Sequence, residues 1–99
     1  MPYLTITRIS GDPDRLHEGY RRSADLMADV GRDNGLLLHA TAKTDDGLLI
    51  VNLWPSMEGS EGAARDPRRR GVLQQLGLRP EQFNREHYEV ADYVTPQPK

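Results

Sequence analysis

The sequence predicts one α+β domain whose core is an antiparallel sheet of four strands. Two β-prone runs, 36–44 and 48–54, flank an Asp-Asp-Gly loop, and Asp-Gly is a strong hairpin signal. Asp-Pro pairs at 12–13 and 66–67 each supply an N-cap followed by a proline at the first helical position, so two helices are expected. Alternating residues near both chain ends predict the other two strands.

The first strand is expected over residues 3–9, where β-branched residues alternate with others. A turn and helix start follow at 11–13, and Asn34-Gly35 marks the helix end. One continuous helix to about Asp33 is predicted between them. Its apolar residues at helical spacing are Leu16, Tyr20, Ala24, Met27 and Val30.

The register of the hairpin decides which side chains share a face of the sheet. A two-residue type I′ turn at Asp46-Gly47 would place Thr41 opposite Asn52 and His39 opposite Trp54. We prefer this register, because a three-residue loop would slip the pairing by one and scatter polar groups over both faces. One face is then apolar and comprises Leu36, Leu38, Ala40, Ala42, Leu49, Val51 and Leu53. The other is mixed and comprises Leu37, His39, Thr41, Lys43, Leu48, Ile50, Asn52 and Trp54.

The second helix is predicted in two parts. Ser56 is a good N-cap with Glu58 in the first turn, but two glycines weaken the segment 56–65. The segment 67–76 is expected to be firmer, with an apolar stripe of Val72, Leu73 and Leu76. Residues 83–94 then read as a last strand. This order of elements is that of the ferredoxin-like fold, with strand order 4-1-3-2 and both helices on one face.

Composition limits the class of protein. Ninety-nine residues form one domain, expected over 1–94 with a flexible tail at 95–99, and a chain this short buries only about 60–65% of its unfolded surface. With 36% hydrophobic residues the core is thin, and a partner subunit would ease that shortage. The net charge of −2 argues against nucleic-acid or membrane binding.

Several kinds of chemistry lack their sequence signals. There is no cysteine for a disulfide, thiol nucleophile or thiolate metal site, and no apolar run of the length of a signal core or membrane span. A cytoplasmic protein is therefore expected. There is also no phosphate-binding glycine loop, Rossmann fingerprint or nucleophile elbow. Any chemistry would be cofactor-free and would rest on proton transfer in an apolar cavity.

Three stretches carry a family resemblance. They are the strand 49–54 running into Trp54-Pro55-Ser56, the preceding Thr-Asp-Asp-Gly at 44–47, and the terminal Tyr-Glu-Val-Ala-Asp-Tyr-Val at 88–94. In these the chain resembles the dimeric α+β-barrel family, and within it the antibiotic-biosynthesis-monooxygenase-like and stress-responsive barrel proteins. The resemblance implies a homodimer whose two sheets pack face to face, with a small-molecule pocket between each sheet and its helices.

On that basis the apolar face is assigned to the partner and the mixed face to the helices. The resemblance makes Trp54 a pocket wall, and His39, Asn52 and Trp54 are the candidate catalytic residues. His39 is the best-placed general base, and Asn52 would steady an anion unless Thr41 is merely its structural partner. The predicted substrate-binding residues are Tyr3, Thr5, Thr41, Tyr20, Met27 and Ile50.

Three further groups of residues have a functional and a structural explanation. His87 and Glu89 could form half of a metal site, with His39 as the nearest third ligand. However, His39 lies on strand two and the other two on strand four, at opposite edges of the sheet. At roughly 4.8 Å per strand these edges are about 14 Å apart, so no metal is expected. The arginines at 65 and 68–70 mark either an anion-recognising pocket mouth or, as we favour, a solvated face. Haem-degrading relatives use an Asn on strand one and a His on the second helix, and neither is present here.

The favoured function is therefore cofactor-independent oxygenation of an aromatic or polyketide-like molecule. A cyclase or isomerase on the same scaffold would use the same proton chemistry without oxygen. A non-catalytic small-molecule carrier or stress-response protein is the alternative from another class.

Overall fold

The computed structural model describes residues 1–94 and has the predicted α+β architecture. Its strands are β1 Tyr3–Ser10, β2 Leu38–Thr44, β3 Gly47–Trp54 and β4 Phe83–Glu89. Its helices are α1 Pro13–Arg22, α2 Ala24–Asp33, α3 Met57–Arg65 and α4 Pro67–Gln75, with a short 3-10 turn at Pro80–Gln82. The predicted tail 95–99 lies outside the described residues.

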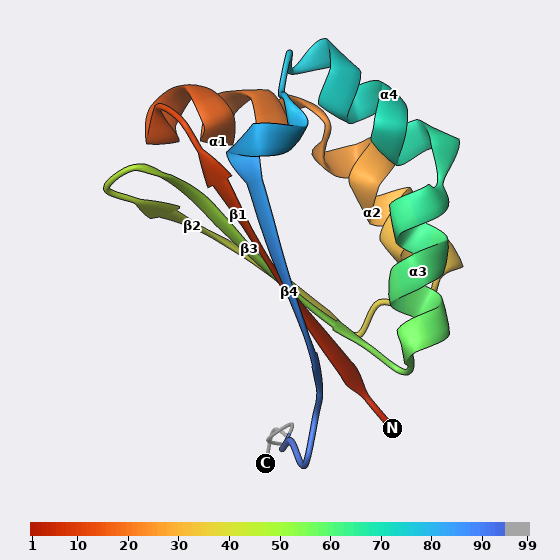
Figure 1. Cartoon of the computed structure of the whole chain (residues 1–99). Coiled ribbons are helices and arrows are strands. Elements are labelled where there is room, and N and C mark those ends of the chain that lie inside the picture. Colours follow the sequence, from red (N-terminus) through yellow and green to blue (C-terminus); the bar gives the residue numbers. More distant parts are fainter. Residues whose placement is uncertain (95–99) are drawn as a thin grey trace, which may run out of the picture.

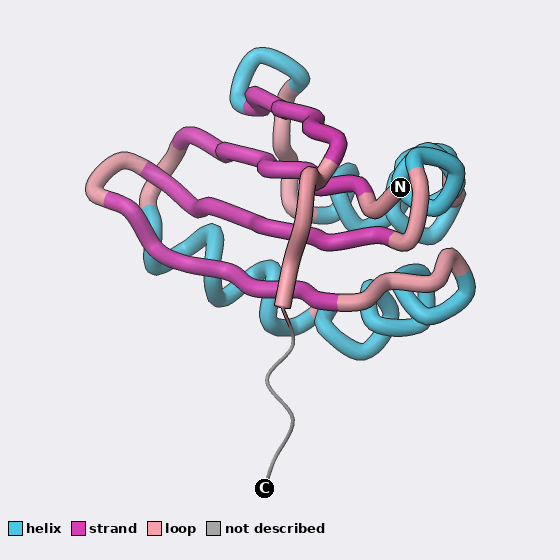
Figure 2. Tube along the Cα trace, turned by 90° about the horizontal axis from the view of Figure 1, so that it is seen from below, coloured by secondary structure: helices cyan, strands magenta, loops and turns pink. Residues whose placement is uncertain are grey.

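The sheet is antiparallel in the order β2-β3-β1-β4, as predicted. The four helices cover one face of it (Figure 1). Figure 2 shows the opposite face from below, with the strands in front and the helices behind them. The fold is thus two layers, and one broad face of the sheet has no cover from the described chain.

The prediction of one continuous first helix was wrong, because the helix breaks at Ser23. The backbone there leaves the helical region, with φ −101° and ψ 7°, and the Ser23 N–H bonds back to the carbonyl of Tyr20. The break lets the two halves take different partners. α1 lies against β2 and β3, whereas α2 packs against α4.

The hairpin turn is centred one residue earlier than predicted. Thr44 pairs with Gly47, so Asp45 and Asp46 form the turn. No residue of 1–94 other than glycine has a positive φ, which excludes the type I′ turn. Gly47 serves β3 instead: a Cβ there would lie 1.8 Å from the carbonyl oxygen of Ile9 in β1, so the close approach of the two strands requires glycine.

This shift corrects the cross-strand partners but leaves the faces unchanged. His39 lies opposite Asn52 rather than Trp54, and Thr41 lies opposite Ile50 rather than Asn52. Because each strand residue keeps its parity, the mixed face still points to the helices and the apolar face away from them. Leu36 is the exception: it was predicted on the apolar face, but it lies before β2 begins and packs inward against Val30 and Trp54. Leu48, Ile50 and Trp54 on the mixed face are buried.

The core has two parts, both between the sheet and the helices. Ile9, Leu48 and Ile50 form one cluster, joined by Leu16 and Phe83. The second cluster is Val30, Trp54 and Ala63, joined by Tyr3 and Leu36. On the other face Leu38 remains 53% exposed and Tyr88 49% exposed. Apolar side chains on the outer face therefore lack the cover that the inner face has.

The two-part second helix was predicted correctly, and the last strand was predicted too long. Ser56 occupies the N-cap position of α3 but its side chain makes no capping bond, whereas Asp66 accepts from the Arg68 N–H at the start of α4. β4 ends at Glu89 because its neighbour β1 begins opposite, at Tyr3, and only the Val90 N–H to Pro2 bond follows. In the described range no helix is both long and apolar enough to span a membrane.

Candidate functional site

A cavity of about 70 Å³ lies between the inner face of the sheet and the helices. That is room for several water molecules. Of the residues predicted for the site, Thr5, Tyr20, Met27, Ile50, Asn52 and Trp54 line it. Tyr3, Thr41 and His39 do not line it, although each lies on the mixed face.

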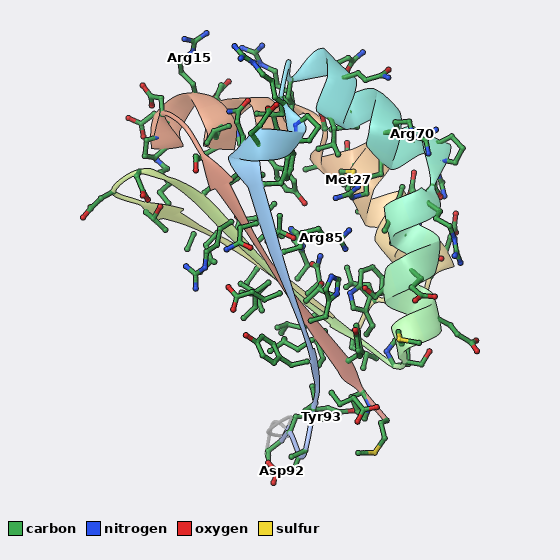
Figure 3. All side chains as sticks on the ribbon, viewed as in Figure 1. Arg15, Met27, Arg70, Arg85, Asp92 and Tyr93 are labelled. Carbon is green, nitrogen blue, oxygen red and sulfur yellow. The ribbon has the colours of Figure 1, made fainter. Side chains whose placement is uncertain are left out.

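Sequence reasoning missed most of the polar lining and considered Arg69 only as part of the arginine run at 65 and 68–70. Thr7 and Ser60 are buried polar residues at the cavity, and Arg69 of α4 and Arg85 of β4 reach it from opposite layers. Figure 3 shows Arg85 directed from β4 into the space between sheet and helices, while Arg15 projects outward from α1. The alternation of β4 was the available signal, because Arg85 shares the inner face with His87.

A hydrogen-bonded series runs from the cavity to the surface. Asn52 Oδ1 lies 2.6 Å from His39 Nδ1, and His39 Nε2 lies 3.4 Å from the Tyr20 hydroxyl. The rings of Tyr20 and His39 also stack, with centroids 5.8 Å apart and an interplanar angle of 15°. Tyr20 and Asn52 line the cavity, and His39 is exposed. The imidazole therefore connects two cavity groups with solvent.

The amide oxygen of Asn52 fixes the protonation of the histidine ring. A carbonyl oxygen only accepts, so the proton of a neutral His39 sits on Nδ1 and is donated to Asn52. His39 Nε2 is then an acceptor for the Tyr20 hydroxyl. The amide oxygen of Asn52 is occupied by His39, whereas its Nδ2 donor group has no acceptor among the described residues. The arrangement leaves an N–H donor at the cavity.

Tyr20 stays protonated at neutral pH. Burial raises its pKa to about 12, and the positive charge of Arg69 opposes part of that rise. A protonated phenol can pass one proton on while it receives another, but it cannot act as a standing base.

Trp54 is held by the protein itself. Its Nε1–H donates to the Thr5 hydroxyl at 3.2 Å, and both side chains are buried. The indole N–H is therefore not free for a ligand, and only the ring surface faces the cavity. The indole can therefore serve as the pocket wall that the resemblance implies, through its ring surface alone.

The arginines of α3 and α4 do not act as one group. Arg68 bonds to Asp66 and Asp33, and this contact lowers the pKa of the Asp66 carboxyl. Arg65 and Arg70 are exposed. Arg69 turns inward to the cavity, so the favoured prediction of a solvated face fails at this one position.

His87 and His39 lie at opposite ends of one row across the sheet. The row is His87, Thr5, Asn52 and His39, one residue from each strand. His87 packs against the ring of Tyr3 at 5.9 Å. Within residues 1–94 no group of three or more His, Cys, Asp or Glu side chains is placed to hold a metal ion.

Comparison with solved structures places this architecture among known folds. Rv0793 from Mycobacterium tuberculosis superposes with a TM-score of 0.71 at 19% identity, covering 96% of this chain and all of that one. SnoaB from Streptomyces nogalater, a cofactor-independent oxygenase, gives 0.66 at 18% identity over 97% and 98%. The chain has the fold of the antibiotic-biosynthesis-monooxygenase-like proteins.

Other comparisons add to this at the level of fold. The monooxygenase ActVA-Orf6 from Streptomyces coelicolor, solved with the ligand Nanaomycin D, gives a TM-score of 0.68 at 16% identity over 97% and 92%. No protein-family model matches the sequence. No curated protein matches it either. The resemblance predicted from three short sequence stretches is therefore confirmed by the shape of the whole described chain.

Proposed function

We propose that this protein is a cofactor-independent monooxygenase that oxidises a small aromatic or polyketide-like molecule in the cavity. The series Asn52, His39 and Tyr20 is the observation that supports this most. It joins a cavity amide and a cavity phenol to an exposed imidazole. Such a series can carry a proton between a ligand and solvent, which is what oxygenation of an electron-rich substrate needs from the protein.

The chemistry balances without a cofactor when the substrate supplies the electrons. An anthrone serves as the example. Loss of a proton gives its enolate, which transfers one electron to dioxygen, and the two radicals combine into a peroxide on the same carbon. That carbon then loses its second proton as the O–O bond breaks. The products are a quinone carbonyl and one water.

Each residue has a defined part in this proposal. The acidic carbon of the substrate gives its proton to the Tyr20 oxygen while Tyr20 passes its own proton to His39 Nε2. Asn52 Nδ2 donates to the oxyanion that forms in the cavity. Trp54 supplies a flat wall against which an aromatic ring can stack. His39 acts through Tyr20 rather than on the substrate, since it does not line the cavity.

The proposal includes a homodimer through the outer face of the sheet. Two rows there are largely apolar: Leu38, Leu53, Leu4 and Tyr88, and then Ala40, Val51, Ile6 and Glu86. Exposed apolar area of this kind is characteristic of an interface. A second copy of the chain would give the outer face the cover that the helices give the inner one.

Oxygen uptake tests the catalytic part of the proposal. Anthrone is added to the protein in air and under nitrogen, with a protein-free blank, and both oxygen loss and quinone absorbance are followed. We expect His39→Ala and Asn52→Ala to lose about 100-fold or more in rate. His87→Ala removes an exposed histidine at the other end of the same row and should change nothing.

The other outcomes contradict the proposal in distinct ways. Conversion of the substrate without oxygen uptake would indicate a cyclase or isomerase. Saturable binding with no turnover in either gas would indicate a carrier.

A further inference from the structure

Two guanidinium groups enter the cavity from opposite layers. Arg85 projects from the middle of β4, where it lies opposite Thr7 of β1, and Arg69 comes from the first turns of α4. Figure 3 shows Arg85 between the sheet and the helix pair α3 and α4. The two charges therefore meet at one cavity although sixteen positions separate them in the chain.

Neither guanidinium is neutralised by the part of the chain that the structure describes. Every ion pair found in residues 1–94 involves other residues. Arg85 Nε is also fully buried and has no hydrogen-bond acceptor there. Arg68 shows the contrast, because it holds two carboxylates at the surface one residue away. Other arginines without an ion pair, such as Arg65 and Arg70, are exposed to solvent, whereas Arg69 and Arg85 line the cavity.

Two guanidinium groups without a protein partner are energetically costly at a largely apolar cavity. Burial lowers the pKa of Arg69, and the nearby charge of Arg85 lowers it further. A guanidinium nevertheless remains charged in proteins, so the repulsion persists. Buried charges are normally paired, and a donor without an acceptor destabilises the fold. An anion bound between the two groups would remove both penalties.

The cavity indicates which anion fits. Its remaining lining is mainly apolar, with Trp54, Phe83 and Ile50 among its walls, and contains no carboxylate. A planar guanidinium matches the two oxygens of a carboxylate with paired N–H donors. We propose that Arg69 and Arg85 bind the carboxylate of an aromatic acid whose ring lies against Trp54. The inference deepens the proposed function by naming its substrate class, and it rests on that proposal only in taking this cavity as the ligand site.

A pair of probes that differ only in charge tests the inference. Phenylacetate and phenylacetamide have nearly the same shape, and the chain contains one tryptophan, so Trp54 fluorescence reports binding at the cavity. We expect the wild-type protein to bind the acid about 10-fold or more tightly than the amide. Arg85→Met and Arg69→Met should each lose about 10-fold in affinity for the acid and little for the amide. Arg70→Met, on the exposed side of α4, is the matched control.

Stability of the ligand-free protein gives a second test. Arg85→Met removes a buried, unpaired donor and should raise the melting temperature, whereas Arg70→Met should leave it unchanged. Equal affinity of the wild-type protein for acid and amide would overturn the carboxylate site, as would no binding of either. Absence of oxygen uptake with anthrone would overturn the oxygenase and leave this charge selectivity standing.

Discussion

His39 Nδ1 lies 2.6 Å from Asn52 Oδ1 on the neighbouring strand, which is the closest side-chain hydrogen bond among the described residues. The pair exists because the hairpin turns at Asp45 and Asp46, which brings these two residues directly opposite each other. A change of register by two residues would separate them. The turn therefore determines the chemistry at the cavity rim.

A double-mutant cycle measures this coupling. His39→Ala, Asn52→Ala and the double variant should show a coupling of about 0.5–1 kcal/mol in the free energy of unfolding, since His39 is exposed and the bond is partly replaced by water. Urea titration gives the values. His87→Ala combined with Asn52→Ala should be additive, because His87 does not contact Asn52. Additivity in both cycles would mean that the His39 contact does not form in solution.

Thr5→Val tests how Trp54 is held. The variant keeps the shape of the side chain but leaves the buried indole N–H without its acceptor, so we expect a loss of about 1–3 kcal/mol in unfolding free energy. Thr7→Val is the control, because Thr7 is also buried on this strand face and its hydroxyl makes no side-chain bond in the described range. It should cost less than about 0.5 kcal/mol, the lower value of a lost hydrogen bond, because this variant loses no side-chain hydrogen bond. Equal effects of the two variants would argue against the Thr5 bond.

The buried phenol of Tyr20 should make the free energy of unfolding depend on pH in the alkaline range. Its folded pKa of about 12 lies above the ordinary value of 10.0. Between these values the unfolded chain loses the proton that the folded chain keeps, so the stabilisation present below pH 10 is lost as pH rises towards 12. The amount is about 2 kcal/mol.

Tyr20→Phe should remove that loss, which denaturation at a series of pH values would reveal. Tyr93→Phe, at an exposed site, should leave the pH profile as it is in the wild type. A tyrosinate absorbance titration in which all tyrosines ionise together near pH 10 would contradict the burial of Tyr20.

The proposed dimer interface on the outer face of the sheet should be disrupted by one charged substitution. Val51 lies on the central strand β3 between Ala40 and Ile6, so Val51→Glu places a carboxylate inside the proposed interface. We expect the wild-type protein to sediment at twice the chain mass of 11.2 kDa and this variant at 11.2 kDa. Arg70→Glu, on the helical side, should stay dimeric. A wild-type monomer at micromolar concentration would contradict the interface.

Local sequence signals predicted the elements and the faces of the sheet well. Asp12-Pro13 and Asp66-Pro67 begin α1 and α4 as expected, because capping and the fixed φ of proline act within a few residues. Strand parity survived the error in register, since a shift of two residues returns every side chain to its own face. The split at Ser23 was not predictable in this way, because the apolar spacing of residues 16–30 runs through it without interruption.

The site was harder to predict than the fold. Asn52 and Trp54 reach the cavity because they share one face of β3, which alternation alone reveals. The partners of Asn52 depended on the turn, where Gly47 is required by the approach of β1 rather than by the turn itself. Arg69 and Arg85 come together only through the packing of α4 against α2 and α3, which holds it over the sheet, so no local pattern indicates their common cavity.

The indole signal of Trp54 offers the most direct test that the cavity is the ligand site. With one tryptophan in the chain, a nitrogen–proton correlation spectrum contains a single indole cross-peak. We expect anthrone added under nitrogen to shift this peak saturably. The side-chain methyl signals of the outer sheet face should not move. An unchanged indole peak, or shifts confined to that outer face, would contradict a ligand between the sheet and the helices.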